Sequence, residues 1–308
     1  MATFLLGVLL WIVISIVIEL ANAPEETLPL PTESEVRVFD MGLPKINNRA
    51  ELIGRLNEQG YAGDEWVQAY VSWLEDRGFP ASYHWVLKEN EQLNELFNDF
   101  DDAELLIIAG RGDLAAMHEL AERSLAADDP LEALAWYDRA IVSGSLYAMI
   151  RTSDLITTLT DPALSEFITN PEWQQALSKL RAEDPPPRER ALAWLLAAVN
   201  VGGYALMDDG QARRITTLQK QLDPAQLASA CETAQNYVLE AASARRALGN
   251  AVFTTDGPPV AVTVSNAENI IACDVAIAPL VTMTACTQEN FVGPGPELFT
   301  LWTCVEPL

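Results

Sequence analysis

Four cysteines are the residues of this chain whose chemistry is easiest to interpret. Cys231, Cys273, Cys286 and Cys304 follow one another at separations of 42, 13 and 18 residues. Structural zinc sites use closely spaced pairs such as C-x-x-C, and the sequence has none. An even number of cysteines in an exported chain predicts disulfides, with free buried thiols as the alternative. Three pairings are possible; we favour Cys273–Cys286 together with Cys231–Cys304.

The other reactive residue types form no recognisable catalytic pattern. The two histidines, His84 and His118, lie within helical patterns, which is typical of surface or hydrogen-bonded structural histidines. Motifs of serine hydrolases, zinc peptidases and phosphate-binding loops are missing from the sequence. A Ser–His–Asp triad assembles only in space, so whether the chain is an enzyme stays open. We identify no catalytic residue, cofactor-binding residue or metal ligand.

The charge balance restricts the partners. The 308 residues contain 44 Asp and Glu against 19 Lys and Arg, a formal net charge of -25. This excess argues against nucleic acid, whose phosphates need clustered cations, and against docking on anionic lipid through a charged face. Apolar residues make up 49% of the chain, enough for a real core. The acidic run at 97–104 lacks the order of a calcium loop and predicts a solvated helix start instead.

An uncharged apolar stretch covers residues 4–18, and an A-x-A pattern ends at Ala23. The stretch is either a retained membrane anchor over residues 4–20 or a secretory signal removed after Ala23; a buried core helix is a third alternative. The lack of a preceding Lys or Arg and the following Pro24 favour the anchor. The acidic, proline-rich residues 24–46 predict an extended linker outside the cytoplasm. We therefore expect a single-pass protein of a bacterial inner membrane with a periplasmic soluble part, or a secreted periplasmic protein.

Residues 47–248 show a helical pattern throughout, in short segments. Five breaks pair Asp or Asn with Pro, a combination that caps a helix and then fills its first position. These breaks are Asp129-Pro130, Asp161-Pro162, Asn170-Pro171, Asp184-Pro185 and Asp223-Pro224; Glu132 and Gln226 extend two of them into capping boxes. Upstream, Trp66, Tyr70, Trp73 and Leu74 share one helix face, which predicts a core stripe, with a peptide-binding groove as the alternative.

Two short patterns recur in the middle of the chain. Gly112 to Met117 returns as Gly144 to Met149, an offset of 32, and Glu132 to Trp136 returns as Arg190 to Trp194, an offset of 58. The larger offset predicts an insertion at residues 161–185. Alanines in these segments allow helices to approach closely, and the turn positions of Gly144 and Gly202 suit a left-handed residue.

At these residues the chain resembles the Sel-one-like repeat, a relative of the tetratricopeptide repeat. The residues that match the family pattern are Gly112, Ala116, Leu120, Ala121, Ala133, Trp136, Tyr137, Ala140 and Gly144, followed in a weaker copy by Trp194, Ala198 and Gly202. The resemblance implies a tetratricopeptide-like α-helical array that binds proteins, often in bacterial envelopes. Because the loop between the paired helices is short and lacks the usual Gly-x-Gly turn, we expect the array to be irregular. It implies no reaction.

The last sixty residues change in composition. No Lys or Arg follows Arg246, and residues 259–265 and 270–277 favour extended chain. We expect residues 249–308 to form a small, cysteine-containing, irregular or β segment on a mainly α protein. The predicted function is a non-catalytic cell-envelope scaffold that binds a protein partner. The alternative is an envelope hydrolase that uses paired carboxylates in a helical groove, and a purely structural tethered domain is a third possibility.

Overall fold

The computed structural model describes residues 42–81, 83–87, 97, 99–165, 168–251, 253, 257–265, 267, 270, 273 and 285–305. The membrane anchor or signal at 1–23 and most of the linker at 24–46 lie outside these residues. Within the described ranges, no helix combines the length and the apolar character that crossing a bilayer requires.

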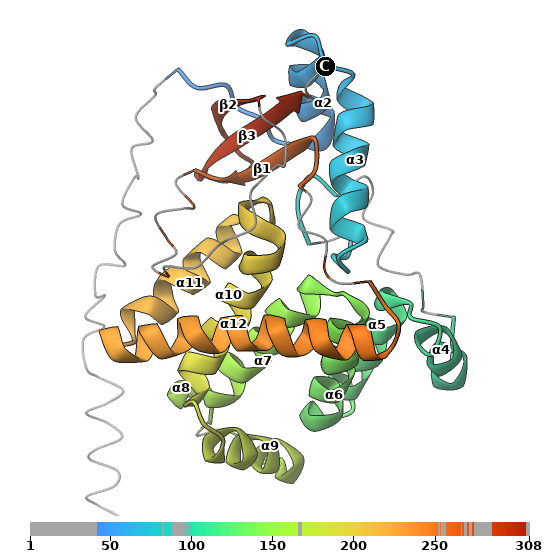
Figure 1. Ribbon diagram of the computed structural model, residues 1–308, viewed down its shortest axis with the longest axis vertical. Coiled ribbons are helices and arrows are strands. Elements are labelled where there is room, and N and C mark those ends of the chain that lie inside the picture. The colour runs from blue at the N-terminus through green and yellow to red at the C-terminus, as the bar shows by residue number, and fades with distance from the viewer. Residues whose placement is uncertain are drawn as a thin grey trace, which may run out of the picture. The chain divides into compact units, whose positions relative to one another are not determined.

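The described chain is mainly helical and ends in a small sheet, as predicted (Figure 1). The helices are α2 (Arg49–Glu58), α3 (Gly63–Glu75), α4 (Asp102–Ala109), α5 (Leu114–Ala126), α6 (Pro130–Ser143), α7 (Leu146–Thr160), α8 (Pro162–Ser165), α9 (Pro171–Ala182), α10 (Pro187–Gly202), the 3-10 helix η2 (Gly203–Leu206), α11 (Asp209–Lys220) and α12 (Pro224–Ala247). The strands are β1 (Val260–Val264), β2 (Ala285–Val292) and β3 (Leu298–Val305).

Most predicted helix starts are confirmed. Asp129, Asn170 and Asp223 each accept backbone N–H groups of the helix that follows, and proline stands at its first position. The capping box of Gln226 forms completely, whereas only the Asp129 half of the predicted box at Glu132 forms. The prediction at Asp184-Pro185 is wrong. Three prolines follow one another there, and α10 begins only at Pro187, behind a Pro186 that has no side-chain acceptor.

The helical array is built from pairs with alanine at their contacts. α5 packs against α6, α7 packs against α10, and the long α12 lies across α6 and α10 (Figure 1). Fully buried alanines line these contacts, namely Ala133 and Ala140 on α6, Ala191, Ala197 and Ala198 on α10, and Ala230 and Ala234 on α12. A methyl side chain lets two backbones approach closely, so the array excludes water with little side-chain bulk.

The sheet has the order β1-β3-β2 with both pairs antiparallel. Lys45 forms a parallel bridge with Val292, and the Ile46 N–H donates to the Val292 carbonyl at 2.9 Å. The sheet therefore reaches back to the first described residues. Only the first of the two predicted extended segments can be compared: residues 260–264 form β1, and most of 270–277 lies outside the described residues.

The aromatic stripe on α3 is a core stripe. Tyr70, Trp73 and Leu74 are buried and Trp66 is half-buried. The Tyr70 hydroxyl lies 3.0 Å from the carbonyl oxygen of Ala205 on η2 and 3.1 Å from that of Val262 on β1. Burial raises the pKa of Tyr70 far above its usual value, so the hydroxyl stays a donor. One side chain thus fastens α3 to both the array and the sheet.

Candidate functional site

The repeat-defining residues lie on three helices and at their ends. Gly112 precedes α5, Ala116 and Leu120 are buried on α5, Ala133, Trp136, Tyr137 and Ala140 are buried on α6, Gly144 ends α6, and Trp194 and Gly202 belong to α10. α8 and α9 occupy residues 162–182, inside the predicted insertion at 161–185. Trp136 carries the Arg139 guanidinium 4.2 Å from its ring centroid, whereas Trp194 stacks on Tyr237 of α12 at 4.0 Å.

The two turn glycines behave differently. Gly144 has a φ of 119° at the end of α6, the left-handed conformation that its position predicted. The same prediction for Gly202 is wrong, because Gly202 has a φ of -94° and the next residue, Gly203, has a φ of 67°. Gly202 is required for space instead: an added Cβ would stand 2.3 Å from Leu206 Cδ1 and 2.9 Å from Leu146 Cδ1.

A network of charged side chains crosses the array. The Tyr137 hydroxyl donates to Glu122 at 2.7 Å, and Arg151 donates to Glu122 at 2.8 Å and to Asp154 at 3.3 Å. Asp154 also pairs with Arg214 of α11. Burial raises the pKa of Asp154, and the two guanidinium groups oppose that shift. The network therefore holds α5, α6, α7 and α11 together and leaves each of its charges paired.

Asp208, the residue before α11, is half-buried. Its carboxylate caps α11 by accepting the Gln211 N–H at 2.9 Å, in a reciprocal capping box. Burial nevertheless raises the pKa of Asp208 to about 6, because the charged form has lost its water.

This pKa predicts a dependence of stability on pH. A carboxyl whose pKa is raised in the folded state favours folding when protonated, so its contribution is complete below about pH 4 and is lost as pH rises through about 6. When the pH rises from 4 to 7, the free energy of unfolding should fall in the wild type by about 2 kcal/mol more than it falls in Asp208→Asn. Asparagine still caps a helix. Denaturant titrations of both proteins at the two pH values measure the difference, and parallel pH profiles would contradict the assignment.

Both histidines are buried structural residues. Burial lowers the pKa of His84 to about 4 and that of His118 to about 3, so both are neutral near pH 7. His118 Nε2 lies 2.9 Å from Ser145 Oγ, which also caps α7. Ser145 has no exposed surface, so a substrate does not reach this pair. The expectation of a helix at His84 is wrong, because the described residues 83–87 form turns.

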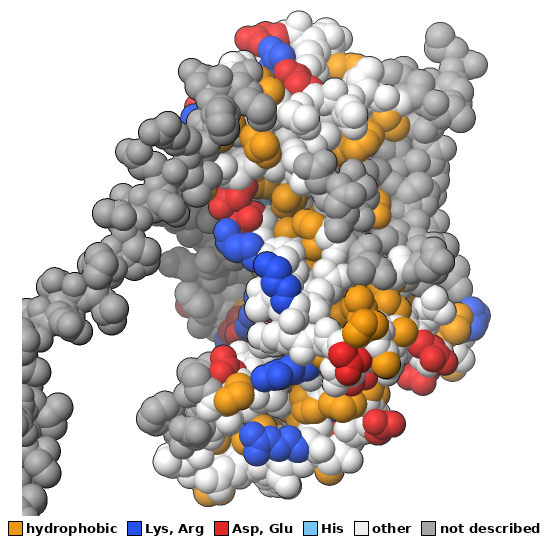
Figure 2. All heavy atoms as spheres, turned by 90° about the vertical axis from the view of Figure 1, so that its left-hand side faces the viewer, with side chains coloured by type: hydrophobic (Ala, Val, Ile, Leu, Met, Phe, Trp, Pro, Cys, Tyr) orange, Lys and Arg blue, Asp and Glu red, His pale blue; other side chains and the backbone are white. Residues whose placement is uncertain are grey.

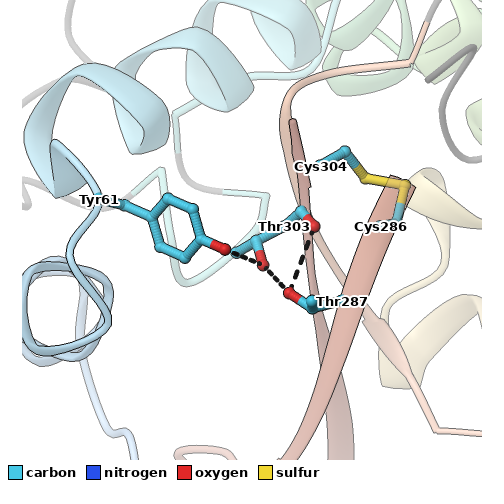
Figure 3. Close-up of a disulfide and its surroundings, with 5 residues drawn as sticks. All are labelled: Tyr61, Cys286, Thr287, Thr303 and Cys304. Carbon is cyan, nitrogen blue, oxygen red and sulfur yellow. Dashed lines mark hydrogen bonds between the residues drawn. A yellow bond between two sulfur atoms is a disulfide. The ribbon is translucent and has the colours of Figure 1, made fainter. Parts of the chain in front are cut away.

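The cysteines form disulfides, but in a pairing other than the favoured one. Cys286 bonds to Cys304 and Cys231 bonds to Cys273. Antiparallel register places Cys286 directly opposite Cys304, with Cα atoms 4.1 Å apart, and the strand pairing that causes this was not predicted. Beside this bond, Thr287 and Thr303 join their hydroxyls across the strands at 2.5 Å, and Tyr61 reaches Thr303 at 3.5 Å (Figure 3).

An apolar surface is exposed on α4. Leu106 and Ile107 are 49% and 60% exposed, and Phe100 just before the helix is 37% exposed. The opposite side of α4 buries Leu105 and Ala109 against the array. We call Phe100, Leu106 and Ile107 the α4 surface. As the acidic run predicted, the helix start is solvated, and Asp101 and Glu104 form its capping box.

A cavity of about 360 Å³ lies where the ends of five helices meet. Its lining comprises Thr160 at the end of α7, Arg181 on α9, Pro186, Pro187, Arg188 and Glu189 at the start of α10, Gln221 and Leu222 after α11, and Gln226 on α12. We call it the arginine cavity. The hydrolase alternative requires two carboxylates in one groove, and this described lining contains one, that of Glu189.

Neither surface was recognised from the sequence. Leu106 and Ile107 follow a capping box, and their pattern is that of an ordinary apolar helix. Arg181 and Arg188 are separated in the sequence by the prolines before α10, so their proximity is not visible there. Comparison of the chain with family models, with curated proteins and with solved structures gives no match in any of the three.

Proposed function

We propose that this chain is a non-catalytic cell-envelope protein whose helical array binds a partner protein through the α4 surface. The observation that carries the proposal is the exposure of Leu106 and Ile107 on a helix that packs with the first hairpin of the array. The end helix of a stacked array needs a polar outer face to remain soluble alone. α4 has an apolar outer face, which favours its covering by another protein.

The charges around the α4 surface indicate the chemistry of the partner. Asp99, Asp101 and Glu104 are exposed beside the apolar side chains. Asp102 pairs with Arg123 at 2.8 Å, and Arg123 also holds the carbonyls of Phe97 and Phe100. The segment before α4 is therefore anchored, and its outer carboxylates face solvent. A basic amphipathic segment matches this surface, whereas a second copy of a chain with net charge -25 would bring like charges together.

The arrangement of the helix pairs supports the resemblance of the array to the Sel-one-like repeat. Trp136 lies on the second helix of the α5–α6 pair, and Trp194 lies on the second helix of the α7–α10 pair. We propose that these pairs are degenerate copies of one unit, with α8 and α9 inserted in the second. Repeats of this type serve as stacked supports for a binding surface.

An envelope location is supported by two features. The uncharged residues 4–18 are long enough to target or anchor the chain, and two disulfides are typical of an oxidising compartment. We propose a periplasmic soluble part attached to a bacterial inner membrane, or released into the periplasm if the leader is removed.

Site-specific photo-crosslinking in cells of the source organism tests the proposed surface. A photoreactive residue at Ile107 should give one defined product, whose crosslinked segment is basic and amphipathic. The matched control is Leu239 on α12, which is apolar and 65% exposed but has no comparable neighbours. Leu106→Ser should lower the yield at position 107 about tenfold, because an apolar contact is lost from the centre of the interface.

The folded state should tolerate Leu106→Ser, because the substitution lies on the surface. Equal products at positions 107 and 239, a yield that Leu106→Ser leaves unchanged, or a product whose crosslinked segment is acidic would each contradict the proposal.

A further inference from the structure

We propose that the arginine cavity binds a small zwitterion, a ligand that carries a carboxylate or phosphate group next to an amine. The proposal concerns a site separate from the α4 surface and does not depend on the proposed function. It is carried by three features of the lining: two arginines without acidic partners, a helix start without a capping side chain, and one carboxylate without a partner on a residue that is 5% exposed.

Two cations of this acidic chain, Arg181 and Arg188, belong to the cavity lining. Arg55, Arg123, Arg151, Arg190, Arg213 and Arg214 each form an ion pair with a carboxylate. Arg181 and Arg188 are exposed, and no carboxylate of the described residues lies within ion-pair distance of either. Figure 2 shows Lys and Arg side chains, with Asp and Glu side chains beside several of them, on the left-hand side of the molecule as Figure 1 draws it. Arg181 and Arg188 therefore place two unpaired positive charges at the cavity, in a chain with 44 acidic residues.

The start of α10 adds hydrogen-bond donors to this charge. Pro186 at the N-cap offers no side-chain acceptor, so the N–H groups of Arg188 and Glu189 have no partner in the described chain. α12 differs, because Asp223 already accepts the first N–H groups of that helix. The free N–H groups and the positive end of a 16-residue helix favour an anionic group at the mouth of α10. The guanidinium groups bind carboxylate or phosphate oxygens through paired donors.

Glu189 indicates the second half of the ligand. The residue is 5% exposed, it lines the cavity, and its carboxylate has neither a hydrogen bond nor an ion pair within the described chain. A simple anion would be repelled by Glu189, whereas a ligand amine would satisfy it. The Gln226 side chain, whose oxygen accepts the Asp223 N–H at 3.0 Å, keeps its amide donors for the anionic group.

Nuclear magnetic resonance titration of the full chain tests the site. The probes form two matched pairs: glycine against acetate, and phosphoethanolamine against inorganic phosphate, all at equal ionic strength set with sodium chloride. The amine-bearing probe of at least one pair should shift the backbone N–H signals of Arg188 and Glu189 and should bind more tightly than its amine-free counterpart. The pair that shows this preference identifies the anionic group as a carboxylate or a phosphate.

Four variants separate the contributions. Arg181→Gln and Arg188→Gln should each weaken binding of the amine-bearing probe about tenfold, the loss expected for a charge-assisted hydrogen bond. Glu189→Gln should abolish the preference for the amine-bearing probe. The amine-free probe should bind to this variant as tightly as to the wild type, or more tightly. Lys179→Gln on α9 makes the same change in net charge at an exposed residue outside the lining, and should bind as the wild type does.

Absence of shifts at Arg188 and Glu189 with all four probes would overturn the proposal. Binding that neither arginine variant weakens, or that Lys179→Gln weakens equally, would overturn it as well. A preference that persists in Glu189→Gln, or no preference in the wild type, would overturn the zwitterionic ligand class. Leu106→Ser should leave these titrations unchanged, so failure here is distinguishable from failure of the partner-binding function.

Discussion

Replacement of Gly78 by alanine is expected to lower the free energy of unfolding by about 3 kcal/mol. Gly78 has a φ of 80°, where an L side chain is strained. An added Cβ would also stand 2.5 Å from Ser145 Oγ and 2.8 Å from His118 Cε1, both buried. The backbone has little freedom to shift, because the Arg77 carbonyl accepts the first N–H groups of α7, from Leu146 at 3.0 Å and Tyr147 at 3.3 Å.

Gly60→Ala provides the matched control for this prediction. Gly60 has a φ of 89°, and a Cβ there would meet nothing within 4 Å. In this variant the free energy of unfolding should fall by about 1 kcal/mol, because only backbone strain is added. Denaturant unfolding of the full-length wild type and both variants measures the two losses. Equal losses would show that the His118–Ser145 pair adds no steric penalty, and would contradict the packing around Gly78.

Removal of the Cys231–Cys273 disulfide is the second large effect that we expect. The bond closes a loop over a separation of 42 residues and ties α12 to the chain that leads into the sheet. The chain-entropy model assigns such a loop about 4 kcal/mol, because the cross-link restricts the unfolded chain. The double variant Cys231→Ala with Cys273→Ala should therefore lose about 4 kcal/mol of unfolding free energy.

The comparison for this prediction is the second disulfide. Cys286–Cys304 closes a shorter loop, with a separation of 18 residues, and its double alanine variant should lose about 3 kcal/mol. Denaturant unfolding with and without reductant measures both, and alkylation before mass analysis counts the thiols. Free thiols in the native wild type would contradict the pairing, and a larger loss for the Cys286–Cys304 variant would contradict the loop-length argument.

Local features were predictable where a few adjacent residues decide the outcome. Asp129, Asn170 and Asp223 cap their helices as the Asp-Pro and Asn-Pro pairs indicate, because a cap depends on the next three residues. The predicted cap at Asp184 is wrong for a local reason too, because the prolines that follow it move the helix start to Pro187. The stripe from Trp66 to Leu74 on α3 was predictable from its spacing alone.

Features that depend on distant residues were not predictable from one sequence. Arg151 meets Glu122 across 29 positions, and nothing in either neighbourhood indicates the other. The disulfide pairing follows from the register of β2 and β3, which local composition does not contain. The arginine cavity has the same character: Arg181 and Arg188 are near in sequence, but Gln221 and Gln226 join them only through the packing of α11 and α12.

The position of β3 in the sheet has a consequence for biosynthesis. β3 lies between β1 and β2 and pairs with both, yet the ribosome makes it after both. Until Leu298–Val305 has emerged, neither outer strand has its neighbour, whereas the hairpins of the array can close as soon as each second helix appears. In a nascent chain the helical array can therefore be folded while β1 and β2 are still unpaired. The bridge from Lys45 to Val292 then forms among the last contacts of the protein.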